Sequence, residues 1–164
     1  MKLKKIVAVL AAAVLAVCLL TACGGDSQAS AKSVGDIRAA VLEANPISNQ
    51  LEITDDHLYL LDYLLTAEDV AEYTGVRSND GYDAGVVLVI KAAEGKAETV
   101  QATLEDYRQS MIAFFGNYPE SAQAMANVEN GVLTVKGDIV VMTFASNECA
   151  DPSALSGAVE AALG

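Results

Sequence analysis

The sequence lacks most of the residue patterns that mark an active site. It has no tryptophan, one histidine and three cysteines among its 164 residues. No serine nucleophile elbow, paired-cysteine motif or HExxH sequence is present, and the glycines at 24–25 and 81–85 match no phosphate-binding loop. Any enzyme site in this chain would therefore have to be assembled from residues that are distant in sequence.

Cysteine is too scarce for a disulfide framework. Cys18 and Cys23 belong to an N-terminal segment described below, so only Cys149 remains in the rest of the chain. Cys149 follows Glu148 and lies close to Asp151, and neighbouring carboxylates raise the pKa of a thiol. We expect a structural cysteine here rather than a reactive one.

Positive charge is scarce as well. Ten lysines and arginines stand against 22 aspartates and glutamates, which gives a formal net charge of −12. A phosphate backbone needs a basic face, so this balance argues against nucleic acid as a partner. It also argues against peripheral binding to anionic lipid headgroups. The carboxylates are scattered along the chain, which favours a general role in solubility over a dedicated cation site.

The N-terminus has the pattern of an export signal. Lys2, Lys4 and Lys5 precede a run of fifteen residues, 6–20, without a polar side chain. A membrane-spanning helix needs about 20 apolar residues, so this run is short for a span. The residues Leu20-Thr21-Ala22-Cys23 then resemble a lipobox, in which lipid is attached to the cysteine and a peptidase cuts just before it. An ordinary cleaved signal with an incidental cysteine is the alternative.

These features predict the organisation of the chain. Residues 1–22 are expected to be a lipoprotein signal peptide, 23–32 a flexible tether of small polar residues, and 33–164 a single domain. Cleavage leaves 142 residues and removes three lysines, which moves the net charge from −12 to −15. Two acyl chains on Cys23 are enough for stable anchoring. We therefore predict a protein anchored by lipid on the extracytoplasmic face of the cell membrane.

Within 33–164, hydrophobic periodicity and turn residues predict helices that alternate with pairs of strands. Ser33 is expected to cap a helix that ends near Glu43, and a second short helix is expected to begin at Thr54. The later elements are strands at 70–78 and 84–90, helices at 97–115 and after Pro119, strands at 132–136 and 139–145, and a last helix after Pro152. Because the strands come in hairpin pairs, we predict an α+β fold: a mainly antiparallel four-stranded sheet built from two hairpins, with helices packed on one face.

Several stretches resemble one family. They are residues 68–73 (EDVAEY), 89–92 (VIKA), 118–120 (YPE) and 135–141 (VKGDIVV). With them, most of 33–164 is similar to an uncharacterised family of bacterial lipoproteins, known as domain of unknown function 4358. The resemblance implies an extracytoplasmic lipoprotein, and a weak association with membrane O-acyltransferases and envelope modification. It implies no activity and no catalytic residue.

His57 is the main candidate for chemistry. It follows Asp55 and Asp56, but adjacent positions on one helical turn point in different directions and converge poorly on one metal ion. A capping turn explains the three residues without a metal. A general base would need a nucleophile and an orienting partner, and no local motif supplies either. Asn79, Asp80 and Asp83 faintly resemble a calcium loop, for which a hairpin turn is the alternative.

The tyrosines give the better hint of a binding surface. Tyr59 and Tyr63 are one helical turn apart, and Tyr73 and Tyr82 border the first predicted hairpin. Packing in or near the core is the alternative for most of them. We predict a non-enzymatic binding or accessory module of a cell-envelope system, without cofactor or metal, whose partner is an envelope protein such as a membrane O-acyltransferase or a transporter. The alternative is a small envelope hydrolase or transferase with a site assembled around His57.

Overall fold

The central strand of the sheet, β3 (Val86–Ala92), explains the layered architecture of the domain. Leu88 and Ile90 point into one core cluster, whereas Val87 and Val89 point into another. All four side chains are fully buried. Since successive residues of a strand face opposite sides of the sheet, both faces must be covered.

The computed structural model describes residues 32–164. The predicted signal peptide, Cys23 and the tether up to residue 31 lie outside the described residues. Residues 32–164 form one compact unit. The strands are β1 (Gln50–Glu52), β2 (Val70–Ser78), β3 (Val86–Ala92), β4 (Val132–Lys136) and β5 (Ile139–Phe144). The helices are α2 (Val34–Ala44), α3 (Ala97–Gly116), α4 (Ala122–Glu129) and α5 (Leu155–Leu163), with short turns η1 (His57–Leu61), η2 (Pro119–Ser121) and η3 (Pro152–Ala154).

The sheet has five strands in the order β1-β2-β3-β5-β4, and all neighbouring pairs are antiparallel. Both predicted hairpins are present, β2–β3 and β4–β5, and the second turns at Gly137 with a φ of +62°. The fifth strand is β1, which is three residues long and fully exposed. It was not predicted because so short an exposed strand carries no hydrophobic alternation.

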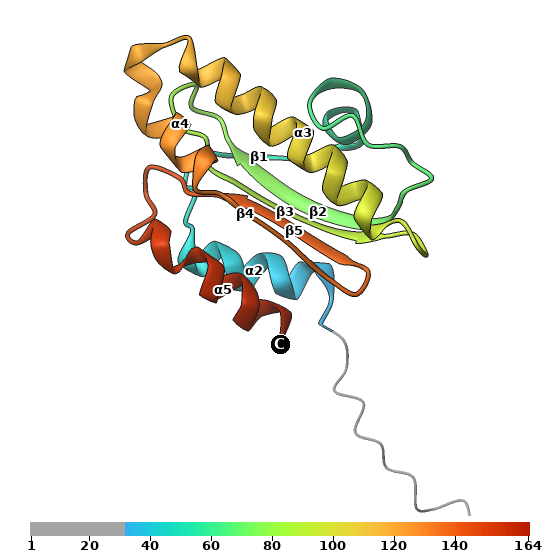
Figure 1. Ribbon diagram of the computed structural model, residues 1–164. Coiled ribbons are helices and arrows are strands. Elements are labelled where there is room, and N and C mark those ends of the chain that lie inside the picture. Colours follow the sequence, from blue (N-terminus) through green and yellow to red (C-terminus); the bar gives the residue numbers. More distant parts are fainter. Residues whose placement is uncertain (1–31) are drawn as a thin grey trace, which may run out of the picture. The chain divides into compact units, whose positions relative to one another are not determined.

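Helices cover both faces of the sheet, which corrects the prediction of helices on one face. Helices α2 and α5 pack on the face that presents Val87 and Val89. Helices α3 and α4 and the η1 segment pack on the face that presents Leu88 and Ile90 (Figure 1). The prediction was wrong because the unbroken apolar strand at 84–90 already required cover on both sides. None of the helices within residues 32–164 is long and apolar enough to cross a membrane.

Two ends of the domain can be distinguished. At the entry end, where the described chain begins, Ser33 and Asp36 form a capping box on α2, as the sequence predicted. Lys32 Nζ donates a 3.0 Å hydrogen bond to the carbonyl of Ala161, so the start of α2 lies beside the end of α5 (Figure 1). The β4–β5 turn and the start of α3 are at this end. The far end carries the β2–β3 turn and the end of α3.

Candidate functional site

The chain from Thr54 to Leu65, hereafter the leucine segment, carries the most exposed large apolar side chains of the described residues. Leu60, Leu61 and Leu64 are 70%, 66% and 63% exposed. The predicted helix forms here as a π-helical turn, η1, in which the amide of Asp62 bonds to the carbonyl of His57. This wider turn puts Leu61 outward, whereas α-helical spacing predicts that it shares one apolar face with Leu58 and Leu65. The sequence LYLLDYLL (58–65) predicts one amphipathic helix, so its spacing does not show that these leucines are exposed.

The leucine segment also contains strained backbone and buried polar atoms without hydrogen bonds. Leu64 has a φ of +54°, the only positive φ of a non-glycine residue in the described chain. Beneath it, the hydroxyl of Tyr63 is buried without a hydrogen-bond partner. Asp62 and Arg77 stand 3.9 Å apart, and the facing Oδ2 and Nε atoms are both buried without hydrogen bonds. Strained backbone and unpartnered polar atoms of this kind cluster at functional segments.

Tyr59 belongs to this segment, and Tyr73 of β2 lies beside it. Their rings meet edge to face, with centroids 6.3 Å apart. The hydroxyl of Tyr73 donates a 2.5 Å hydrogen bond to Asp55, which ties the segment to β2. Burial, together with this bond to the carboxylate, raises the pKa of Tyr73 well above its ordinary value.

The other two tyrosines predicted to line a binding surface lie elsewhere. Tyr63 is 1% exposed and packs against Tyr107 at a centroid distance of 4.4 Å, so its assignment to a surface is wrong and its alternative, core packing, holds. Tyr82 is 61% exposed at the far end, in the β2–β3 turn. The structure therefore brings together only Tyr59 and Tyr73 of the four.

His57 closes the turn that begins the leucine segment. Its Nδ1 atom accepts the backbone N–H of Thr54 at 3.2 Å and lies 2.9 Å from the Thr54 hydroxyl. This arrangement is that of a side chain three residues into a helix that bonds back to the capping residue. His57 lines none of the three hollows described below.

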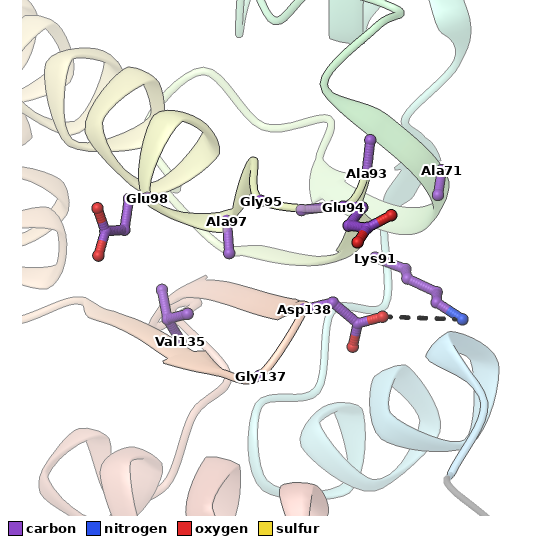
Figure 2. A pocket seen from close by; sticks show the side chains of 11 residues that line it. Ala71, Lys91, Ala93, Glu94, Gly95, Ala97, Glu98, Val135, Gly137 and Asp138 are labelled. Carbon is purple, nitrogen blue, oxygen red and sulfur yellow. Dashed lines mark ion pairs between the residues drawn. The ribbon is translucent and has the colours of Figure 1, made fainter.

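A hollow of about 780 Å³ lies at the entry end (Figure 2). Alanine and glycine form most of its wall, between the loop after β3 and the β4–β5 turn. Lys91 and Asp138 face each other at 3.8 Å on one side, and Glu98 lies on the other. Its cation is already paired and its remaining charges are exposed carboxylates, so the hollow presents no convergent set of free polar groups.

A second hollow, of about 390 Å³, lies between α4 and the start of α5, and a third lies at the far end. The third holds about 290 Å³ and is lined by Gly81, Tyr82, Phe114, Tyr118, Glu120 and Ser121. The sequence did not predict Phe114 and Tyr118 as part of a binding surface, because no local pattern shows that one side of the end of α3 remains exposed.

The residues considered for calcium build the β2–β3 turn instead. Asp80 accepts the amide of Tyr82 at 3.0 Å, and Asp83 accepts the amides of Gly85 and Asn147 at 2.9 and 3.1 Å. These are the bonds of a hairpin turn. Within residues 32–164, no group of three histidine, cysteine or acidic side chains is placed to hold a metal ion.

Cys149 is half-buried near the end of α2. Its thiol contacts the carbonyl of Ala44 at 3.5 Å. Burial is the main cause that raises the pKa of this thiol, and the charge of Asp151 acts in the same direction. A raised thiol pKa leaves little thiolate at neutral pH.

The geometry defines a three-layer α+β domain with exposed apolar surface in its described part. The chain belongs to the family described as domain of unknown function DUF4358, whose model matches residues 45–145. The match takes in all five strands, the leucine segment and the far-end hollow, and leaves out α2 and α5. No curated protein and no solved structure matches the chain.

Proposed function

We propose that this protein is an extracytoplasmic lipoprotein, anchored through lipid on Cys23, that serves as a non-enzymatic binding module of a cell-envelope system. The leucine segment is the observation that carries the binding role. Three leucines within five residues stand more than 60% exposed. Burying one leucine side chain is worth about 1.5–3 kcal/mol, so a partner that covers this segment gains substantially.

The conformation of the segment supports the same proposal. The backbone at Leu64 costs about 1–2 kcal/mol relative to an ordinary φ. The buried polar atoms of Asp62 and Arg77 would gain hydrogen bonds from a modest shift. A partner that repacks the segment therefore relieves strain as well as covering leucines.

Charge indicates the chemistry of the partner. Asp56 and Glu68 are exposed carboxylates that flank the leucines in sequence, and no lysine or arginine occurs between residues 54 and 76. Arg77, which follows this stretch, already faces Asp62. We therefore propose a protein surface with apolar side chains bordered by lysine or arginine. Such a surface on an extracytoplasmic loop of a membrane O-acyltransferase or a transporter fits the envelope context that the family resemblance implies.

The length of chain between Cys23 and Lys32 fits a partner at the membrane. Eight residues separate Cys23 from Lys32, and the nine steps between their Cα atoms span at most about 32 Å. A domain of this length has a radius of gyration of about 14 Å. An anchored domain would therefore stay within about its own diameter of the bilayer surface.

The binding role is tested by cross-linking on intact cells. A photo-reactive amino acid replaces Leu61 in one variant and Ala40 in a control, since Ala40 is exposed on α2, on the opposite face of the sheet. We expect Leu61 to capture one membrane protein and Ala40 to capture none. The adduct should disappear in a variant with Leu60→Asn and Leu64→Asn, because the apolar side chains of the contact are lost. Asparagine is chosen because it tolerates the positive φ at position 64. An adduct that persists in that variant, or is equal at both positions, would overturn the leucine segment as the contact.

The anchor is tested separately. Cys23→Ala should release the protein from the membrane fraction. A Cys23→Ala protein that has lost its signal and yet stays with the membranes would overturn the lipid anchor and leave the binding role standing.

The enzyme alternative rests on one observation, the 2.9 Å contact between the Thr54 hydroxyl and His57. A hydroxyl beside an imidazole is the first half of a nucleophile–base pair. The backbone amide of Thr54 donates a hydrogen bond to the same nitrogen, Nδ1 of His57, and this bond is typical of a helix cap. We expect His57→Ala to preserve the cellular role. Loss of that role in a folded His57→Ala protein, with the Leu61 adduct retained, would favour a hydrolase or transferase.

A further inference from the structure

Three aromatic side chains surround the hollow at the far end of the domain. Tyr82, Phe114 and Tyr118 are 61%, 51% and 47% exposed. Tyr82 comes from the β2–β3 turn, whereas the other two come from the end of α3 and the residues after it (Figure 1). Rings from two separate elements thus border one space of about 290 Å³.

Each side of the hollow is fixed by contacts of its own. Phe114 lies between Phe115, which is buried in the core, and Tyr118, with ring centroids 5.2 and 5.4 Å away. Across the hollow, the backbone of Tyr82 is held by Asp80 at 3.0 Å and by Asn147 at 3.4 Å. The Phe114 ring is thus packed against its neighbours and the backbone that carries Tyr82 is held in place, which lowers the cost of binding.

The charge of the hollow has one sign. Glu120 is the only acidic or basic side chain in its wall, and Asp80 and Asp83 lie in the same turn as Tyr82. The four lysines of residues 32–164 all contact groups at the entry end of the domain. The three arginines of that range each pair with a carboxylate. No cation of the described chain neutralises the hollow.

We propose that this hollow binds an organic cation, an ammonium or guanidinium group. Aromatic faces carry partial negative charge and attract such groups, and a carboxylate at the rim adds to the attraction. The volume suits a quaternary ammonium or the end of a basic side chain, because larger ligands need pockets of about 300–1,000 Å³. The site is separate from the leucine segment and does not rest on the function proposed above.

The test is calorimetric titration of the full-length protein in a maltoside detergent, which contains no ammonium group. The probes are choline, its neutral isostere 3,3-dimethylbutanol and the capped amino acid N-acetyl-arginine amide, at constant ionic strength. We expect one-to-one binding of a cation that is at least about tenfold tighter than binding of the isostere. Preference for choline would identify a small quaternary ammonium ligand, and preference for the arginine derivative would identify a side chain of a protein.

Matched variants locate the binding. Phe114→Leu and Tyr118→Leu keep apolar bulk but remove a ring, and each should weaken cation binding about tenfold. Glu120→Gln should weaken it less. Tyr59→Leu removes a half-buried ring remote from the hollow and should leave affinity unchanged. Equal binding of choline and its isostere, no saturation by either cation up to about 50 mM, or affinity lost equally in Tyr59→Leu would overturn the proposal.

Discussion

Asn45 and Thr143, which are 98 residues apart in the sequence, are joined by a 2.9 Å hydrogen bond in the core. The Asn45 amide also donates to the carbonyl of Phe144 at 2.8 Å and accepts the amide of Ser146 at 2.8 Å. Asn45 is fully buried at the end of α2, so its side chain fastens this helix to the far end of β5.

We predict that Asn45→Ala lowers the free energy of unfolding by about 2–4 kcal/mol, because it leaves buried groups of β5 and the following loop without partners. Asn117→Ala is the matched control. The amide of Asn117 bonds to a carbonyl of its own helix on the surface, so its loss should cost less than about 1 kcal/mol. Urea unfolding of both variants measures the difference, and equal losses would contradict the role assigned to Asn45.

Stability should fall as the pH rises above about 10. Burial raises the pKa of Tyr63, Tyr73 and Tyr107, in the last case to about 12, whereas tyrosine in an unfolded chain titrates near 10. Between these values the unfolded chain loses protons that the folded chain keeps, so unfolding becomes more favourable. Asp69 raises the pKa of Lys96, which acts in the same direction.

The tyrosine contribution can be isolated with a Tyr73→Phe, Tyr107→Phe double variant. Its free energy of unfolding, measured in urea between pH 8 and about 11.5, should fall less steeply with pH than that of the natural protein. Identical slopes would show that these two tyrosines are not the source of the alkaline instability.

Glycine should be accepted at position 64 and not at position 61. The positive φ of Leu64 is costly for leucine and free for glycine, while glycine loses more entropy on folding. We expect Leu64→Gly to be neutral or up to about 1 kcal/mol more stable. Leu61→Gly, in the π-helical turn, should be about 1 kcal/mol less stable. Urea unfolding measures the stability of both variants. A larger loss of stability in Leu64→Gly than in Leu61→Gly would contradict backbone strain at Leu64.

Two glycines of the β2–β3 turn should respond differently to a methyl group. A Cβ atom on Gly85 would lie 2.6 Å from Cβ of Ser146, whereas one on Gly81 would meet nothing within 4 Å. We expect Gly85→Ala to cost about 1–3 kcal/mol and Gly81→Ala to change stability by less than about 1 kcal/mol. Thermal unfolding of the two variants measures this, and a tolerated Gly85→Ala would show that the turn can move away from Ser146.

Local features of this fold could be predicted because they depend on neighbouring residues. Ser33 and Asp36 form a capping box within one turn, and Gly137 with Asp138 closes a hairpin between two adjacent strands. The apolar run at 84–90 became the central strand for the reason expected, since both of its faces are buried. The DUF4358 membership, confirmed over residues 45–145, rests on the same local patterns.

The candidate sites could not be predicted in the same way. The far-end hollow joins Tyr82 to Phe114 and Tyr118, more than 30 residues away, because β2–β3 and α3 end at the same edge of the domain. Of the predicted tyrosine surface, Tyr63 proved to be core, because a π-helical turn rotated its neighbours outward. Periodicity assumes one fixed helical pitch and does not detect such a turn.

The sequence by itself determined the helices, the two hairpins, the acidic character and the family of this protein, and it predicts the lipid anchor. These depend on short-range backbone preferences and on composition. Only the tertiary structure decided that β3 pairs with β5, that helices cover both faces, and that three leucines and three aromatic rings stay exposed. Exposure is decided by what packs against a side chain, and those contacts come from segments far away in the chain.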